Sequence, residues 1–79
     1  MSNTPHELAE EFPDATETMH RLKQEDAHFA KLCDDYHNVN RTLHRAETKV
    51  EPVSEDAESQ MRRNRMALKD EIARILSAA

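Results

Sequence analysis

Between Phe29 and Val50 apolar residues recur at alternating intervals of three and four, and this pattern constrains the fold more than any other feature of the chain. Such spacing places the apolar side chains on one stripe of a helix and is typical of a coiled-coil seam. It therefore predicts a long amphipathic helix over about residues 27–49. Seven positions form the predicted stripe: Phe29, Leu32, Tyr36, Val39, Leu43, Ala46 and Val50.

A second amphipathic segment follows and matches the first. Pro52 disfavours helical geometry at the residue before it, so a turn is expected there, and Ser54 is a suitable N-cap for a helix over about residues 55–77. Two helices joined by a short turn favour an antiparallel hairpin. In the register that pairs the most apolar residues, only Val39 faces a polar position. The facing apolar pairs are Leu43 with Met61, Tyr36 with Leu68, Leu32 with Ile72, and Phe29 with Ile75.

The residues before the hairpin predict a helical arm over about residues 6–24. Thr4 and Pro5 together are typical of a helix start, so a short first helix is expected there. Pro13 ends this helix, and Pro13 or Asp14 opens a second segment. Asp26 lies in a polar run and is a good N-cap, so we expect a break between the arm and the hairpin at that point. The alternative is one uninterrupted helix.

A small core favours self-association. A chain of 79 residues buries about 60% of its unfolded surface, and only 37% of these residues are apolar. We therefore expect one all-α domain, residues 1–79, that assembles into a dimer or a higher helical bundle. The apolar residues of the arm find no partners in the last helix, so they fold back onto the hairpin, pair with another copy or stay exposed. They form the predicted protein interface: Leu8, Phe12, Met19 and Leu22.

Basic side chains gather at the predicted turn end of the hairpin, although the net charge is −5. Residues 1–35 carry nine acidic and three basic side chains, whereas residues 36–79 carry seven and eight. A basic cluster can contact the phosphates of RNA or DNA. Against this, no aromatic side chain accompanies the arginines for base stacking, and nearby acids can pair with them. The candidate nucleic-acid contacts are Arg41, Arg45, Lys49, Arg62, Arg63 and Arg65.

The sequence offers little for catalysis or metal binding. Glycine is absent, and no hydroxyl lies in a glycine-rich turn or a nucleophile elbow, so we expect neither an enzyme nor a cofactor. Cys33 and His37 lie one helical turn apart and can share a metal ion, with His44 two turns further, but one chain offers too few ligands for structural zinc, so we predict no metal site. A single cysteine, no signal-like apolar run and no stretch able to span a membrane predict a cytoplasmic protein without membrane contact.

Three sets of short motifs are distributed along nearly the whole chain. They are His6-Glu7-Leu8 followed by Phe12-Pro13, Leu22-Lys23 before a polar break and His28-Phe29, and the run Leu68-Lys69-Asp70-Glu71-Ile72. Together they resemble the YdcH family, which comprises small bacterial helical-hairpin proteins of unknown function. Ala27 departs from the family pattern, in which proline is expected, and this weakens the predicted break without removing it. The resemblance implies a self-associating hairpin and no activity.

Two functions remain as predictions. The first is a non-catalytic helical hairpin that binds itself and another protein through apolar side chains. The alternative is a small nucleic-acid-associated protein that uses the arginines. The first kind of binding should survive high salt and be lost in Phe12→Ala, whereas the second should show the reverse, because salt screens exposed charges.

Overall fold

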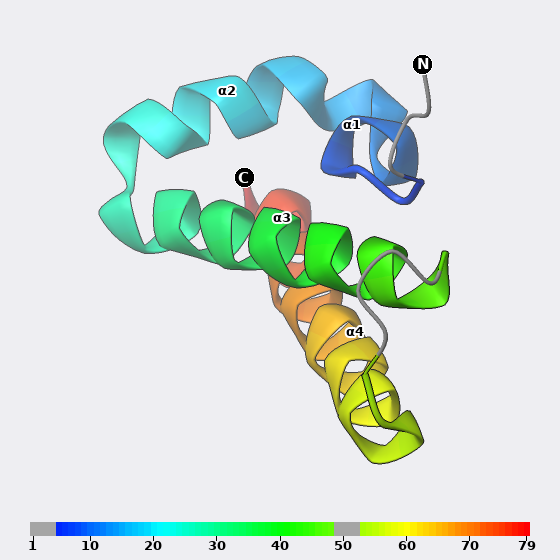
Figure 1. Cartoon of the computed structure of the whole chain (residues 1–79). Coiled ribbons are helices and arrows are strands. Elements are labelled where there is room, and N and C mark those ends of the chain that lie inside the picture. The colour runs from blue at the N-terminus through cyan, green and yellow to red at the C-terminus, as the bar shows by residue number, and fades with distance from the viewer. Residues whose placement is uncertain (1–4, 49–52) are drawn as a thin grey trace.

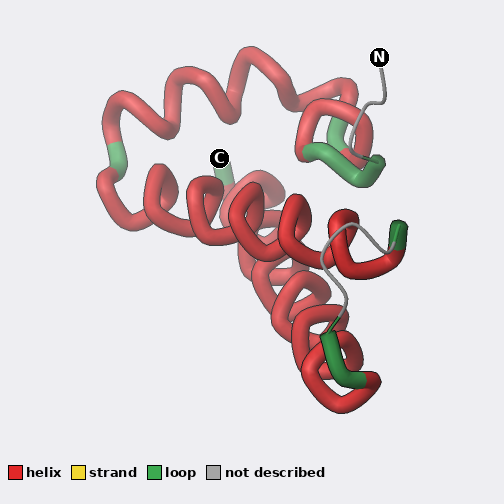
Figure 2. Tube along the Cα trace, viewed as in Figure 1, coloured by secondary structure: helices red, strands yellow, loops and turns green. Residues whose placement is uncertain are grey.

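The computed structural model describes residues 5–48 and 53–79, and within them the chain is helical apart from short connections (Figure 1, Figure 2). The all-α class is therefore confirmed. Predictions that rest on Thr4, Lys49, Val50 and Pro52 lie outside the described residues. The elements in order are α1 (Leu8–Glu11), the 3-10 turn η1 (Pro13–Ala15), α2 (Thr16–Glu25), α3 (Ala27–Glu47) and α4 (Glu55–Ala78).

Helices α3 and α4 form the predicted antiparallel hairpin, and α4 is inclined to α3 rather than parallel to it (Figure 1). Leu32 and Ile72, one of the predicted facing pairs, both belong to the buried core. Polar side chains also join the two helices at three levels. These contacts are His28–Glu71 at 3.3 Å, Asn40–Arg65 at 3.0 Å and Glu47–Arg62 at 3.0 Å.

Both hairpin helices begin at the predicted caps. A carboxylate oxygen of Asp26 accepts hydrogen bonds from the backbone amides of His28 at 3.0 Å and Phe29 at 3.3 Å. The Ser54 hydroxyl oxygen accepts one from the amide of Ala57 at 3.1 Å. Such bonds satisfy amides that have no partner within the helix. The break at Asp26 is therefore confirmed, and the alternative of one uninterrupted helix is wrong.

The N-terminal arm folds back along α3, so that α2 lies beside α3 (Figure 1). The sequence left three arrangements open for the apolar residues of the arm. This chain adopts the first, in which they fold back onto the hairpin. One continuous core results, with side chains from the arm, α3 and α4. Its buried members are Leu8, Met19, Phe29, Leu32, Cys33, Tyr36 and Ile72.

The first helix begins later than predicted, at Leu8 rather than near residue 6. His6 has φ of 62°, a left-handed conformation that is uncommon outside glycine. The carbonyl of Pro5 accepts a hydrogen bond of 2.8 Å from the Asn40 side chain, and that of His6 accepts one of 2.6 Å from the Tyr36 hydroxyl. These carbonyls therefore bond to α3 and not to amides one turn later, which explains why α1 does not start at Pro5.

The buried face of α3 is wider than the predicted stripe. Cys33 and Asn40 are fully buried although the apolar spacing leaves them out, whereas Val39, a member of the stripe, is only half-buried. The reason is that α3 packs against two neighbours, the arm and α4. A single stripe of apolar residues describes contact with one neighbour, so the pattern missed the side of α3 that faces the arm.

Candidate interaction groove and the arginine end

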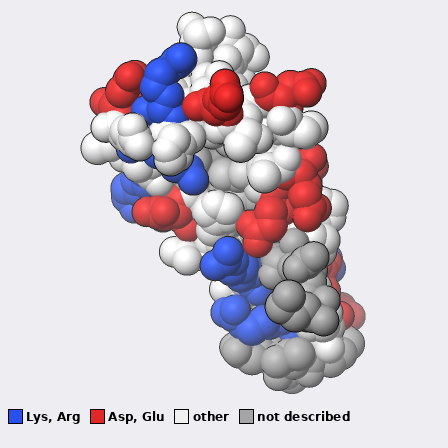
Figure 3. All heavy atoms as spheres, turned by 90° about the horizontal axis from the view of Figure 1, so that it is seen from above, with Lys and Arg blue, Asp and Glu red and all other residues white. Residues whose placement is uncertain are grey.

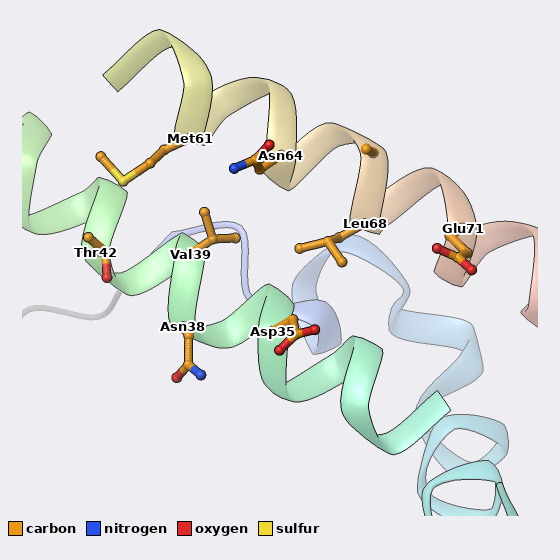
Figure 4. Close-up of a pocket in the computed structure, with 9 residues that line it drawn as sticks. Asp35, Asn38, Val39, Thr42, Met61, Asn64, Leu68 and Glu71 are labelled. Carbon is orange, nitrogen blue, oxygen red and sulfur yellow. The ribbon is translucent and has the colours of Figure 1, made fainter. Parts of the chain in front are cut away.

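An open groove of about 570 Å³ lies between α3 and α4 (Figure 4). Val39 of α3 and Met61 and Leu68 of α4 supply its apolar lining, and Figure 4 shows the three side chains directed toward the space between the helices. Asn64 of α4 lies opposite Val39, which fits the predicted polar position facing this valine. The groove is therefore an apolar surface that the described residues leave open.

Acidic side chains lie at one end of the groove. Asp35 and Glu71 line one end, where Lys31 contacts Asp35 at 3.4 Å and His28 contacts Glu71 at 3.3 Å. Lys31 and His28 are exposed to solvent, whereas Asp35 and Glu71 are half-buried. Arg63, nearer the start of α4, is not among the residues that line the groove; it is exposed and donates a hydrogen bond of 3.1 Å to the Gln60 side chain. Within residues 5–48 and 53–79, no carboxylate forms an ion pair with Arg63.

Glu7 attaches the arm to α3. Its carboxylate accepts a hydrogen bond of 2.8 Å from Nδ1 of His37 and lies 3.5 Å from Nε of Arg41. These contacts lie beside those of Tyr36 and Asn40 with the start of the arm. The arm is thus held by several polar bonds in addition to its apolar contacts.

Glu11 forms a second polar attachment, this time between the arm and α4. His6 Nδ1 lies 2.8 Å from one carboxylate oxygen, and Lys69 Nζ lies 3.5 Å from the other. The hydrogen bond from His6, with help from the charge of Lys69, lowers the pKa of Glu11 from its ordinary value. Burial of Tyr36, with a smaller contribution from the nearby Glu11 carboxylate, raises the pKa of the Tyr36 hydroxyl to about 12.

The four apolar residues of the predicted protein interface pack inside the chain. Leu8 and Met19 are 3% and 5% exposed, and Phe12 and Leu22 are half-buried against the same core. They do not form an open apolar patch. Their contact with another protein stays a prediction, and it requires the arm to leave α3.

Charged side chains at the start of α4 pair with one another. On the face shown in Figure 3, Lys and Arg side chains gather at the narrow end of the molecule with acidic side chains close by. Arg62 contacts the carboxylates of Glu47 at 3.0 Å and Glu58 at 3.1 Å. The hydrogen bond to Glu47, together with the charge of Glu58, raises the pKa of the Arg62 guanidinium.

The other candidate nucleic-acid contacts also bond within the chain. Lys49 lies outside the described residues. Arg65 donates to the buried Asn40 side chain at 3.0 Å. The remaining bonds are those of Arg41 to Glu7, Arg45 to Thr42 and Arg63 to Gln60. Most of the candidate arginines are therefore engaged with groups of the protein, and their contact with nucleic acid stays a prediction.

The cysteine and histidine considered for metal binding have other contacts. Cys33 is fully buried, and that burial raises the pKa of its thiol. His37 directs Nδ1 to Glu7. The described part of the chain contains no group of three or more His, Cys, Asp or Glu side chains close enough to hold a metal ion. In the same residues, no helix combines the length and apolar character that crossing a membrane requires.

The fold and the groove define a small helical-hairpin protein whose N-terminal arm covers one side of the hairpin. A family model described as "Protein of unknown function (DUF465)" matches residues 29–76, which include nearly all of α3 and α4. The chain belongs to this family, which corresponds to the YdcH-like small proteins. The match therefore confirms the resemblance seen in the sequence. The match begins at Phe29, so the arm lies outside it. Neither the curated proteins nor the solved structures gave a match.

Proposed function

We propose that the protein is a non-catalytic helical-hairpin module that self-associates and acts through protein–protein contact. The observation that supports this most directly is the groove between α3 and α4, where Val39, Met61 and Leu68 remain accessible. Covering apolar surface gains roughly 25 cal/mol per Å², so a protein surface that fits the groove gains free energy by binding there. The arm already covers the other side of α3, which leaves the groove as an apolar surface that a partner can reach.

The polar side chains around the groove support a binding role rather than catalysis. Asn64 and Thr42 are neutral, and the two carboxylates, Asp35 and Glu71, lie at the rim beside cationic or titratable partners. No hydroxyl or thiol among the groove residues lies within hydrogen-bond distance of a base that would activate it as a nucleophile. Polar side chains around an apolar centre are the usual composition of a protein interface.

The arginine end gives weaker support for nucleic-acid binding. Arg41 and Arg62 contact carboxylates, and Arg65 is half-buried against Asn40. Phosphate would have to compete with these internal partners for each guanidinium. We therefore keep protein binding as the proposal and treat nucleic acid as the alternative that the same experiments can favour.

Sedimentation equilibrium over a range of concentrations tests the proposal. We expect the wild-type chain to self-associate reversibly and Val39→Lys to weaken the association at least about tenfold, because a charge would then be buried in an apolar contact. Met66→Lys is the matched control, since Met66 is 66% exposed on α4 and does not line the groove.

Circular dichroism would first establish that both variants keep the helical fold. A wild-type chain that stays monomeric at every concentration would contradict the self-association. Equal weakening by Val39→Lys and Met66→Lys would contradict the assignment to the groove. Salt-sensitive binding of RNA or DNA by the wild-type chain, lost in a variant with both Arg62→Glu and Arg63→Glu, would favour a nucleic-acid-associated protein instead.

A further inference from the structure

We infer that a pocket between the N-terminal arm and α4 binds a small oxyanion, a carboxylate or a phosphate group, through Arg65 and Lys69. The pocket has a volume of about 390 Å³ and is lined by residues of the arm, α3 and α4. It shares no lining residue with the groove between α3 and α4. The inference therefore goes beyond the proposed protein contact and does not depend on it.

Three cationic side chains of α4 line this pocket. Arg62, Arg65 and Lys69 follow one another at intervals of three and four residues, which places them on one face of the helix. Arg62 already contacts the carboxylates of Glu47 and Glu58, which lie outside the pocket. Arg65 and Lys69 are therefore the two cations that a ligand in the pocket would contact.

Arg65 has a neutral partner where an acidic one is expected. It is half-buried, and it donates a hydrogen bond of 3.0 Å to the side-chain oxygen of Asn40. Within residues 5–48 and 53–79, no carboxylate forms an ion pair with Arg65. Partial removal of a charge from water is unfavourable unless an opposite charge lies nearby, and a guanidinium can bind a carboxylate or a phosphate through two parallel hydrogen bonds. An oxyanion in the pocket would supply that opposite charge.

Lys69 retains donors for a second contact. Its Nζ lies 3.5 Å from a carboxylate oxygen of Glu11, and an ammonium group has three N–H donors. Glu11 is also bound by His6 at 2.8 Å, so its negative charge is largely satisfied within the chain. The other carboxylate of the lining, Asp70, is exposed, where water screens its charge.

The arm is held rigidly where it forms the wall of the pocket. His6 lines the pocket in the left-handed conformation, with φ of 62°, and its carbonyl accepts the hydrogen bond from Tyr36. A residue that is not glycine adopts this conformation only where its surroundings impose it, and such positions are frequent at ligand sites. The pocket is therefore built into the fold before any ligand binds.

Larger or oppositely charged ligands match the pocket less well. A metal ion would be repelled by the three cations of α4. A strand of nucleic acid would need a basic track along the surface, but Arg41, Arg45 and Arg63 do not line the pocket, and the net charge of −5 repels a polyanion. A single oxyanion group requires only the two cations at the pocket itself.

Titration with inorganic phosphate and with acetate, at constant ionic strength and followed by NMR of the amide groups, tests the inference. We expect the signals of Arg65 and Lys69 to shift until the site is saturated with at least one of the two anions. Lys69→Gln should weaken this binding about fivefold or more, because a charged donor is lost. Arg63→Gln is the matched control: it removes the same charge from an exposed position on α4 outside the pocket and should change the affinity less than about twofold.

Substitutions that break no internal contact keep the test independent of folding. Met66 lines the pocket and is 66% exposed, so Met66→Glu would place a negative charge beside the ligand and should abolish saturable binding. Met66→Gln, which is neutral and of similar size, should bind within about threefold of wild type. Asp70→Asn should tighten binding, because it removes a carboxylate that repels the anion.

The outcomes separate this site from the other proposals. Saturable binding that is lost in Met66→Glu, weakened in Lys69→Gln and kept in Arg63→Gln supports the pocket. Shifts that do not saturate, or equal weakening by Lys69→Gln and Arg63→Gln, overturn the inference. Binding of a single-stranded oligonucleotide without binding of phosphate or acetate also overturns it and favours a nucleic-acid-associated protein. A chain that is monomeric in sedimentation contradicts self-association and leaves the pocket unaffected.

Discussion

The Tyr36 hydroxyl donates a hydrogen bond of 2.6 Å to the backbone carbonyl of His6, although the two residues are 30 positions apart. Asn40, one turn further along α3, adds two hydrogen bonds to this attachment. Its amide nitrogen donates to the carbonyl of Pro5, and its oxygen accepts from Arg65 of α4. Two polar side chains on α3 thereby fix where the arm begins and tie it to both hairpin helices. The arm covers one side of α3, and the groove remains on the other.

The burial of Tyr36 can be measured directly, because it is the one tyrosine of the chain. Its ultraviolet absorbance should titrate with a pKa of about 12 in the folded protein and about 10 in urea. The folded pKa is raised, so the associated stability is present below pH 10 and is lost as the pH rises toward 12. A folded-state midpoint near 10 would show that the hydroxyl is exposed and the arm is not packed on it.

Asn40→Ala should destabilise the fold by about 1–3 kcal/mol, because the Pro5 carbonyl and the half-buried Arg65 guanidinium would both lose a hydrogen bond to this fully buried side chain. Asn38→Ala is the matched control: Asn38 is exposed two residues earlier in the same helix, and it undergoes the same change in helix propensity. Urea unfolding followed by circular dichroism measures both. Equal changes in the free energy of unfolding for the two variants would contradict a structural role for Asn40.

Asp26→Ala should lower the free energy of unfolding by about 0.5–2 kcal/mol, because α3 would lose the oxygen that accepts hydrogen bonds from the amides of His28 and Phe29. The same substitution at Asp34, which is exposed within α3, should change stability by no more than about 0.5 kcal/mol. Thermal or urea unfolding of the pair provides the comparison. If Asp34→Ala lowered the free energy of unfolding as much as Asp26→Ala, the role of Asp26 as a helix cap would be contradicted.

Glu11 should make folding stability depend on pH in the acid range. Its pKa is lowered in the folded chain by the hydrogen bond from His6 and the charge of Lys69, so its contribution is present above the unfolded value of about 4.3. That contribution is lost as the pH falls through the lower folded pKa.

In unfolding experiments, Glu11→Gln should therefore be less stable than wild type at pH 7, and the difference should shrink as the pH falls toward 2. Glu10→Gln, at an exposed neighbouring position, is the control and should change stability at pH 7 less than Glu11→Gln does. If the difference in the free energy of unfolding between Glu11→Gln and wild type stayed constant with pH, an ionic attachment of the arm would be contradicted.

The hairpin was predictable because its signals are local. The apolar spacing that begins at Phe29 defined α3, and the caps Asp26 and Ser54 fixed where α3 and α4 start. The turn at His6 was not predictable in this way. Its left-handed conformation is stabilised by Tyr36 and Asn40, which are distant in sequence, and no local pattern marks a carbonyl that will bond to a side chain 30 or more residues away.

The interaction surface was predicted only in part. The sequence indicated surplus apolar surface and assigned it to arm residues such as Phe12 and Leu22, which in the structure pack against their own core. The open surface instead includes Val39, which the spacing placed inside the hairpin seam. The arm covers one side of α3, and the residues on the other side form the open surface. Long-range contacts such as that of Asn40 with Pro5 determine which side is covered, and the local sequence does not reveal them.

The measurement that tests the central claim most directly is a dilution series followed by NMR of the amide groups. On dilution, signals of groove residues such as Val39, Ala67 and Leu68 should shift as the second copy leaves. Signals of Leu8 and Met19 should stay fixed, because the arm remains packed on α3. The opposite result, in which the arm signals shift while the groove signals do not, would contradict association through the groove.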